Sequence, residues 1–442
     1  MEGTSSAQPP PIPRASIDRD AAMVIQRLVR HGFKAYLVGG CVRDLLLGVP
    51  PKDFDVATSA RPRQIKRLFR NSRVIGRRFK LVHVTFGPHT VEVSTFRAPP
   101  DQESDDPYIT RDNIFGDEVS DALRRDFTIN GLFYDIGPGR VIDHVGGCAD
   151  LEGRCVRTIG NAELRIREDP VRILRAAKFA GRLSLHLDPE LRAAAVSHAA
   201  DLGKAAPPRV LEEIYRLLSG RGAAASFRIL EEVGAVQTLF PELLPLPESF
   251  YAALTRLSEE SGGERGALSQ ALLLAVLCAP LVARALPLRD PEEELREILR
   301  PVTERLPASR RDLAGMRLLL AAQAHFLAPP DGRHARRLCS RDYYPEARHL
   351  RAVLGPLAPV EPDPLPLWEE FREGDAGMRP PARRRRRRRR RGGRGRQPLS
   401  GAPNAGTDRE CPPARASSSA PAPATPPSGS QRACSNGDSS PA

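Results

Sequence analysis

Residues 37–58 read LVGGCVRDLLLGVPPKDFDVAT, and this stretch decides what kind of fold the chain must build. The apolar run 35–38 predicts a strand that ends in a pair of glycines, and helical spacing resumes over 42–47. A second strand is predicted over 53–57. A strand, a glycine turn, a helix and another strand in quick succession indicate a unit that mixes sheet and helix.

Asp53 and Asp55 stand two apart on the predicted second strand. Such residues face the same way, about 6.6 Å apart at about 3.3 Å per residue. Their carboxylates can therefore converge on hard cations such as Mg²⁺, which choose oxygen ligands. The alternative is a solvated turn after two prolines, in which the carboxylates pair with Lys52. A DxD motif by itself favours that alternative.

The glycine turn that precedes these carboxylates favours the cation site over the solvated turn. Gly39 and Gly40 let backbone N–H groups approach a phosphate, and the start of the following helix adds its dipole. Arg43 falls in the first turn of that helix, where its guanidinium suits bidentate phosphate contact. A purely structural turn would explain the glycines but not the arginine. A glycine turn so close to a carboxylate pair predicts a nucleotide–metal site.

Two further runs, 81–86 and 90–96, are joined by Gly87-Pro88 and predict a β-hairpin. The second run alternates, with valines on one face and Glu92 on the other. Glu92 is either a third acidic ligand or an exposed strand glutamate, and spacing does not choose between them. Residues 98–116 are polar and acidic, which is typical of a surface loop.

Positive charge gathers in two places. The 442 residues carry a net charge of +13, and residues 376–442 hold 15 Arg against 3 acids, so the rest is nearly neutral. Residues 61–80 contain nine basic residues and no acid, including Arg77, Arg78 and Lys80. Arg383, Arg384 and Arg385 begin a run of nine arginines. Both blocks predict surfaces for an RNA backbone, and the first also suits a triphosphate, unless they are only solvated.

Composition excludes several classes of protein. A hydrophobic fraction of 40% excludes a wholly disordered chain. The longest apolar run, 271–283, contains Pro280 and is too short to span a bilayer, and residues 1–14 lack a signal-peptide apolar region. Seven scattered cysteines without a CxxC pair predict reduced thiols. We therefore expect a cytoplasmic protein with no membrane partner.

Two later clusters combine charges of both signs. Residues 124–130 read RRDFTIN, with two cations, a carboxylate and an amide in seven residues. In residues 168–175, EDPVRILR, helical spacing would place Asp169 and Arg172 on one face. A carboxylate beside a guanidinium offers an acceptor and donors to a base edge. An intrahelical ion pair worth a few tenths of a kcal/mol is the alternative, and periodicity favours it.

Beyond about residue 160, strands stop and helical spacing takes over, which predicts an α+β fold. Helices are expected over 163–182, 209–219, 225–233, 266–279, 310–326 and 343–354. The predicted divisions are a flexible leader (1–17), a head (18–160), a helical neck that binds nucleotide and RNA (161–240), a helical body (241–375) and a disordered Arg-rich tail (376–442).

Five blocks, in this order, resemble the class II nucleotidyltransferases, which comprise CCA-adding tRNA nucleotidyltransferases and bacterial poly(A) polymerases. They are LVGGCVRDLLLG (37–48), KDFDVAT (52–58), EVSTFR (92–97), RRDFTIN (124–130) and REDPVRILRAAKFAGRL (167–183). The resemblance covers about residues 30–240. It implies a polymerase-β-type head with a mixed sheet, followed by an all-α neck and body.

The resemblance also implies roles for residues of the head. In the family, the residues matching Asp53 and Asp55 bind Mg²⁺, and the one matching Glu92 is a proposed third acid. Those in the glycine turn, Gly39 and Gly40, and the one matching Arg43 belong to the triphosphate site.

Further roles are implied around the two later clusters. Asp126 matches another active-site carboxylate, and Arg125 falls where a nucleotide-binding arginine sits. Asp169 and Arg172 match the pair that presents a protein template to the nucleobase, and Arg175 matches a further nucleotide contact.

Within the family, the segment VIGRRFKLVHV (74–84), the stretch 111–116 and the Arg-rich tail resemble the poly(A) polymerase subgroup. The implied reaction is attack of an RNA 3′-hydroxyl, of mRNA or tRNA, on the α-phosphate of ATP, with pyrophosphate leaving. Two Mg²⁺ ions are expected at Asp53 and Asp55. The alternatives are a CCA-adding enzyme and an inactive RNA-binding protein that kept the fold.

Overall fold

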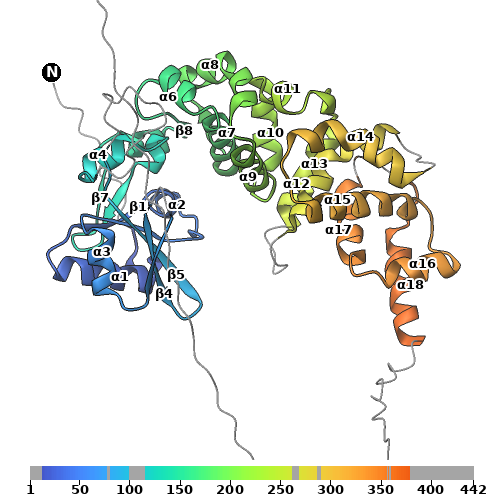
Figure 1. Cartoon of the computed structure of the whole chain (residues 1–442), viewed down its shortest axis with the longest axis horizontal. Helices are drawn as coiled ribbons and strands as arrows, with labels where there is room; N and C mark the ends of the chain where they lie inside the picture. The colour runs from blue at the N-terminus through green and yellow to red at the C-terminus, as the bar shows by residue number, and fades with distance from the viewer. Residues whose placement is uncertain are drawn as a thin grey trace, which may run out of the picture. The chain divides into compact units, whose positions relative to one another are not determined.

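A seven-stranded mixed sheet carries the motifs of the first half of the chain (Figure 1). The computed structural model describes residues 12–76, 80–98, 115–260, 268–285, 290–355, 357 and 360–378. The strands lie in the order β3-β4-β5-β2-β1-β6-β7, and only β2 and β5 run parallel. Their bounds are β1 Ala35–Val38, β2 Asp55–Thr58, β3 Ser72–Ile75, β4 Leu81–Phe86, β5 His89–Thr95, β6 Phe133–Asp135 and β7 Arg140–Ile142.

The two faces of this sheet differ. Helices α1 (Arg19–Arg30) and α3 (Pro62–Leu68) pack on the sheet, where α1 contacts β1, β2 and β5. Val91 and Val93 of β5 are buried in the same core as α1, whereas Glu92 between them is exposed. The predicted alternation in the hairpin is thereby confirmed. The acidic side chains of β2 and β5 consequently lie on the face away from α1.

One predicted strand begins later than expected. Spacing predicts a strand from Asp53, but β2 begins at Asp55, and Asp53 lies in a bend before it. The ladder explains the difference, because β5 pairs with β2 only from Asp55 to Thr58 and β1 only from Val56. Residue 53 has no strand beside it, so its backbone cannot form the hydrogen bonds of a sheet.

Two short helices lie between strands of the sheet, α2 (Gly40–Leu46) between β1 and β2 and α4 (Glu118–Leu123) between β5 and β6, and α5 (Gly147–Glu152) and β8 (Cys155–Val156) follow β7. β8 pairs in parallel with β9 (His186–Leu187). β9 lies beyond residue 160, so the prediction that no strand follows that residue is wrong for this short strand.

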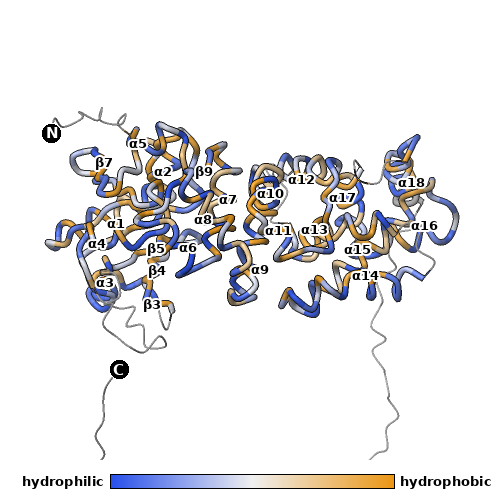
Figure 2. Tube along the Cα trace, turned by 90° about the horizontal axis from the view of Figure 1, so that it is seen from above, coloured by the Kyte–Doolittle hydropathy of each residue, from blue (hydrophilic) through white to orange (hydrophobic). Residues whose placement is uncertain are grey.

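Helices fill the rest of the described chain. They are α6 Ala162–Glu168, α7 Arg172–Leu183, α8 Pro189–Ser197, α9 Pro207–Leu218, α10 Ala223–Glu232, α11 Ala235–Leu239, α12 Glu248–Glu260, α13 Gln270–Ala285, α14 Pro291–Arg305, α15 Arg310–Ala322, α16 Gly332–Cys339, α17 Tyr344–Leu354 and α18 Leu365–Met378. The α+β fold class is confirmed. α13 is coloured hydrophobic along most of its length (Figure 2), and Leu272 to Ala279 are all buried between α14, α15 and α17.

The helix expected over 163–182 is two helices. α6 ends at Glu168 and α7 begins at Arg172, so Asp169 is a C-cap residue with φ −149° and ψ 90°. Proline disfavours the α region for the residue before it and cannot donate a backbone hydrogen bond, and Pro170 follows Asp169 directly. The break changes where the Asp169 side chain points.

A prediction follows from the crossing of α7 and α10. A Cβ added to Gly181 would lie 2.2 Å from Ser226 Oγ and 2.6 Å from Ser226 N. Gly181→Ala should therefore lower the free energy of unfolding by about 1–3 kcal/mol in urea denaturation, despite the better helix propensity of alanine. Gly203→Ala is the control, because its nearest contact, Thr238 Cγ2, lies 3.8 Å away. Equal stability of the two variants would contradict close packing at this crossing.

Candidate active site

The acidic part of the site is built by two neighbouring parallel strands. Asp55 opens β2 and stands directly opposite Glu92 of β5, which in turn stands opposite His83 of β4. The sheet register therefore brings Asp55 and Glu92 together, although 36 residues of sequence separate them. Glu92 Oε1 lies 3.1 Å from His83 Nε2. Sequence reasoning placed no role on His83.

The Asp55 carboxyl lies in a negative environment. Burial raises its pKa to about 6, and the neighbouring charges of Glu92 and Asp53 add to that effect, while Arg125 opposes it. Among the described residues, neither Asp53 nor Asp55 has a hydrogen-bond or ion-pair partner for its side chain. Asp53 is exposed, because the chain is still in the bend before β2.

These residues fit a divalent cation in one respect and fall short in another. Two carboxylates without a cationic partner, one with a raised pKa, form an oxygen donor set whose repulsion a cation would relieve. Across the described ranges, however, no three His, Cys, Asp or Glu side chains are grouped closely enough to form a complete metal site. The structure thus brings together the acids, while the role of Glu92 as a third ligand stays a prediction.

Arg43 occupies a different place from the one its motif suggests. It is 2% exposed, although an arginine that contacts a phosphate was expected in the first turn of α2. Its Nε and Nη2 donate to Asp44 Oδ1 at 2.8 and 2.6 Å, and its Nη1 donates to Asn130 Oδ1 at 2.5 Å. Arg182 of α7 donates to the other Asp44 oxygen at 2.9 Å. Arg43 is therefore held inside an ion cluster that joins α2 to α7.

The glycine turn before Arg43 is confirmed as a conformational requirement. Gly39 has φ +75°, a region that side-chain-bearing residues rarely adopt. A Cβ on Gly39 would lie 3.1 Å from Arg125 Nη1. Gly40 is the first residue of α2. The turn therefore brings backbone against Arg125, the second arginine of the RRD block.

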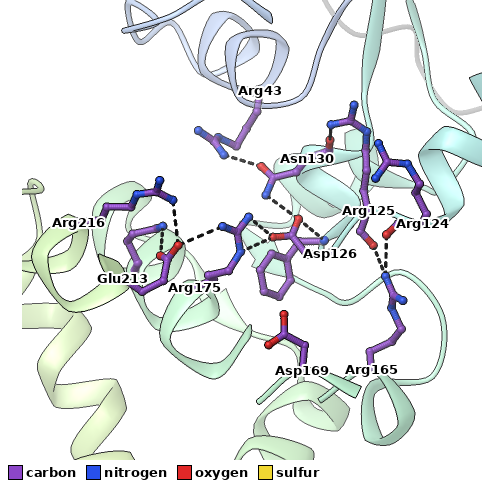
Figure 3. A network of polar contacts seen from close by, with 12 residues as sticks. Arg43, Arg124, Arg125, Asp126, Asn130, Arg165, Asp169, Arg175, Glu213 and Arg216 are labelled. Carbon is purple, nitrogen blue, oxygen red and sulfur yellow. Dashed lines mark hydrogen bonds and ion pairs between the residues drawn. The ribbon is translucent and has the colours of Figure 1, made fainter. Parts of the chain in front are cut away.

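Asn130 and Asp126 continue the polar network from Arg43 (Figure 3). Asn130 Nδ2 donates to Asp126 Oδ1 at 3.2 Å, and the other Asp126 oxygen accepts from Arg175 Nε at 2.8 Å and Nη2 at 2.5 Å. Burial by itself would raise the pKa of Asp126, but the Arg175 guanidinium and these hydrogen bonds hold it below its usual value. Asp126 is therefore a charged hydrogen-bond acceptor fixed by α7.

Glu213 of α9 completes this network, and sequence reasoning missed it. Its carboxylate accepts from Lys178 Nζ at 2.6 Å, Arg216 Nη1 at 3.0 Å and Arg175 Nη1 at 3.3 Å. Burial would raise its pKa, but these three cations lower it. Arg175 thus bridges two carboxylates, one before α6 and one in α9. A buried acid in an amphipathic helix gives no sequence signal that names its partners.

A pocket of about 350 Å³ opens beside this network. It gathers residues predicted for nucleotide binding from separate parts of the chain, with additional lining from α9. Its lining is Arg124, Arg125, Asp126, Asp169, Val171, Arg172, Arg175, Arg209, Glu212 and Glu213. Arg125, Asp169, Arg172 and Arg175, which were all predicted to bind the nucleotide, lie in this one pocket.

Asp169 and Arg172 are not paired with each other. Asp169 Oδ2 accepts from Arg209 Nη2 at 2.7 Å, and Arg172 Nη1 donates to the backbone oxygen of Arg165 and to Glu168 Oε2. The intrahelical ion pair that spacing favoured is therefore wrong, because Pro170 breaks the helix between the two residues. Arg209, a second residue that sequence reasoning missed, holds the carboxylate.

The predicted RNA-binding residues are placed only in part. Lys80 is exposed just before β4, whereas Arg77 and Arg78 lie outside the described residues. Arg383, Arg384 and Arg385 also lie outside them, as do residues 111–114. Within the described chain, no helix has the length and apolar character needed to cross a membrane.

Both the sequence and the fold of this chain are similar to those of known proteins. Residues 35–157 match the profile of the poly A polymerase head domain, and residues 184–246 match that of a probable RNA and SrmB-binding site of polymerase A. The predicted resemblance to the poly(A) polymerase and CCA-adding family is confirmed.

Individual relatives give the same picture. Poly(A) polymerase I of Salmonella typhimurium is 46% identical over 241 residues, which are 52% of this chain and 52% of the relative. The CCA-adding enzyme of Geobacillus stearothermophilus is 38% identical over 218 residues, 49% of this chain and 53% of the relative. The crystal structure of the Bacillus stearothermophilus CCA-adding enzyme in complex with CTP aligns with a TM-score of 0.64 at 28% identity, over 81% of this chain and 82% of that one. The chain thus spans about half the length of the curated relatives it matches.

The Glu213 network yields a stability prediction. Glu213→Gln should lower the free energy of unfolding at pH 7 by about 3 kcal/mol, since it removes the buried negative charge that Lys178, Arg175 and Arg216 share. Because the folded pKa of Glu213 is depressed, its stabilisation is present above its usual value of 4.5 and is lost as the pH falls below that. The gap between wild type and variant, measured by urea denaturation, should therefore narrow from pH 7 to pH 3.5.

The matched control is Glu212→Gln on the next residue. Glu212 is exposed and pairs only with Arg216 at 2.5 Å, so its loss should change stability by less than about 0.5 kcal/mol. Equal effects of the two substitutions would show that the buried network carries no special share of stability.

Asp55 yields a prediction with the opposite sign. Its folded pKa of about 6 lies above its usual 3.8, so the contribution of Asp55 to stability should fall as the pH rises from about 4 to about 6. Asp55→Asn should therefore be more stable than wild type by about 2 kcal/mol at pH 7.5 in EDTA, and equally stable at pH 3.5. Asp53→Asn, at an exposed position, should differ little at either pH. A difference for Asp55→Asn that does not change with pH would contradict the raised pKa.

Proposed function

We propose that this protein is a template-independent polynucleotide adenylyltransferase, which adds AMP from ATP to RNA 3′ ends and releases pyrophosphate. The observation that carries the proposal is the shared pocket, in which Arg125 and Asp126 of the RRD block meet Asp169, Arg172 and Arg175. Arg125 also faces the acid pair, since its charge lowers the pKa of Asp55. A nucleotide bound there would have one end near the acids and the other near the neck residues.

The relatives support poly(A) addition over other reactions. Over similar lengths, poly(A) polymerase I from three organisms is 41–46% identical to this chain, whereas the CCA-adding enzymes are 37–38% identical. Because those matches span about half of each relative, the activity, the substrates and the RNA partner are part of the proposal.

The acid pair is proposed to hold the metal. Asp53 and Asp55 would bind Mg²⁺, with Glu92 as the nearest further carboxylate. Two bound Mg²⁺ ions would supply Lewis-acid stabilisation of charge on the reacting oxygens. The negative surroundings that raise the pKa of Asp55 favour such binding, and protonation below about pH 6 would compete with it.

The neck residues are proposed to select the base. Adenine presents an amino donor and a ring-nitrogen acceptor on its Watson–Crick edge. Asp169 can accept from the amino group, and Arg172 can donate to the ring nitrogen. Arg209 donates to one oxygen of Asp169 and so fixes the position of this acceptor in the pocket. A base with a carbonyl in place of the amino group would be repelled.

The remaining chain groups are proposed to position the nucleotide. Arg125 would contact the nucleotide directly from the head side of the pocket, and Arg175 from the neck side. Arg43 is buried, so in the described state it would act by fixing Asn130 and the turn at Gly39-Gly40 next to the triphosphate. A cytoplasmic location belongs to the same proposal, and the five described cysteines are free.

CCA addition to tRNA is the second candidate. The alignment with the solved structure of the Bacillus stearothermophilus enzyme in complex with CTP covers 82% of that chain and 81% of this one. It therefore includes the helical half as well as the head. CTP also presents an amino group on its base edge, which the same Asp169 would accept.

Catalytic loss is the expected result of removing the acids. Asp53→Ala should abolish AMP incorporation, by at least about 10³-fold, while its thermal unfolding matches wild type, because Asp53 is exposed and bears no structural contact. Asp342→Ala removes an exposed carboxylate of the body and should keep full activity. Retained turnover in Asp53→Ala would overturn the proposed site.

One assay separates the candidate functions. Purified protein with Mg²⁺ would be given an unstructured RNA or a tRNA lacking CCA, with each labelled nucleoside triphosphate in turn. Long A tails on general RNA support poly(A) addition, whereas incorporation of C and A that stops after three residues on tRNA supports the second candidate. No incorporation on either RNA would overturn both.

A further inference from the structure

Helix α16 presents an arginine stripe that lies outside both family profiles. Arg333 and Arg337 stand four residues apart on one side of α16, and Arg341 follows four residues later, in the bend after the helix ends at Cys339. All three are exposed, and Arg336 on the same helix is exposed as well. The profiles end at residue 246, so the family matches assign nothing to this helix.

The stripe is held outward by its own helix. Ala335 and Leu338, on the opposite side, are buried, and α16 packs on α18. Hydrophilic residues predominate along α16 (Figure 2). Two exposed acids, Asp331 and Asp342, flank the stripe, and none lies within it. The buried seam therefore fixes the guanidinium groups in one row toward solvent.

These arginines differ from their neighbours in having no acidic partner. Within the described chain, no hydrogen bond or ion pair engages the guanidinium of Arg333, Arg337 or Arg341. In α14, by contrast, Arg296 pairs with Glu293 at 2.6 Å and Arg300 with Glu297 at 3.2 Å. The arginines of α14 are thus neutralised by a glutamate about one helical turn away, whereas those of the stripe have no such partner among the described residues.

We propose that the α16 stripe, Arg333, Arg337 and Arg341, binds the phosphate backbone of single-stranded RNA as a second contact remote in sequence from the nucleotide pocket. The inference rests on the proposed function, which supplies RNA as the polyanionic partner. Guanidinium forks recognise phosphate bidentately, and a row of them matches a chain of phosphates better than one phosphorylated side chain. The stripe has no exposed large apolar residue that would insert into a membrane.

The test compares two triple variants with the same loss of charge. One is Arg333→Gln, Arg337→Gln, Arg341→Gln. The control is Arg192→Gln, Arg296→Gln, Arg300→Gln, whose arginines are exposed but each paired with a glutamate. Dissociation constants for a 40-nucleotide RNA are measured between 0.05 and 0.3 M KCl, in the full chain and in a chain whose run 383–391 is changed to Gln. Circular dichroism checks that α16 folds.

The stripe variant should bind the RNA about tenfold or more weakly at 0.15 M salt. Its slope of log Kd against log salt should be smaller by about 2, since each phosphate contact on a single strand contributes about 0.7. The control should change neither quantity. AMP incorporation on a 6-nucleotide primer should be the same in both variants, whereas incorporation on the 40-nucleotide RNA should fall only in the stripe variant.

Three results would overturn the inference. The first is an unchanged slope of log Kd against log salt in the stripe variant, and the second is an equal loss of RNA affinity in both triple variants. The third is a stripe variant that keeps its RNA affinity but no longer binds vesicles of anionic phospholipid, which would assign the stripe to a membrane surface. Absence of incorporation on the short primer by wild type would instead defeat the proposed function, and the binding measurements would still decide the role of the stripe.

Discussion

The ion pair between Asp126 and Arg175 is the interaction on which the site depends. It joins the RRD block before β6 to helix α7, and both partners are largely removed from water. Two such charges are costly to bury unless every oxygen and donor is satisfied. Asn130, the backbone N–H of Phe127, and Glu213 meet that demand. The pocket that Asp126, Asp169, Arg172 and Arg175 line lies where these two parts of the chain meet.

The same constraint extends to the glycine turn. Arg43 is tied to Asp44 and Asn130, and Asp44 is tied to Arg182 of α7, so a continuous set of charged hydrogen bonds runs from α2 through the neck to α9. Since removal of one member leaves another buried charge unpaired, the members act together rather than singly. The acid pair at Asp53 and Asp55 stands apart from this network, and among the described residues no cation forms an ion pair with either carboxylate.

The helical half uses charge differently. In α14 the exposed arginines pair with glutamates of their own helix, and such pairs add little stability. The arginines of the α16 stripe have no acidic partner among the described residues. Three unpaired arginines in a row say more about a binding surface than the total charge, which the nine arginines of the tail dominate.

Much of the site followed from local rules. The positive φ of Gly39, the hairpin with alternating valines, and the closeness of the acids to the glycine turn all depend on residues near in sequence, so spacing and side-chain type predicted them. The pairing of Asp55 with Glu92 needed the parallel register of β2 and β5. Pro170 indicates the helix break at Asp169, but the residues on both sides keep helical spacing, and that spacing predicted one continuous helix.

By itself, the sequence determined the resemblance to the nucleotidyltransferases, the order of the motifs and the identity of the charged groups, because each of these is a property of short stretches. Only the tertiary structure decided which charges meet: that Arg43 is buried, that Asp169 is held by Arg209 rather than by Arg172, and that Glu213 anchors Arg175. Ion pairs form between groups that are close in space, and burial sets the strength of the interaction. The spacing of residues along a chain gives neither that distance nor that burial.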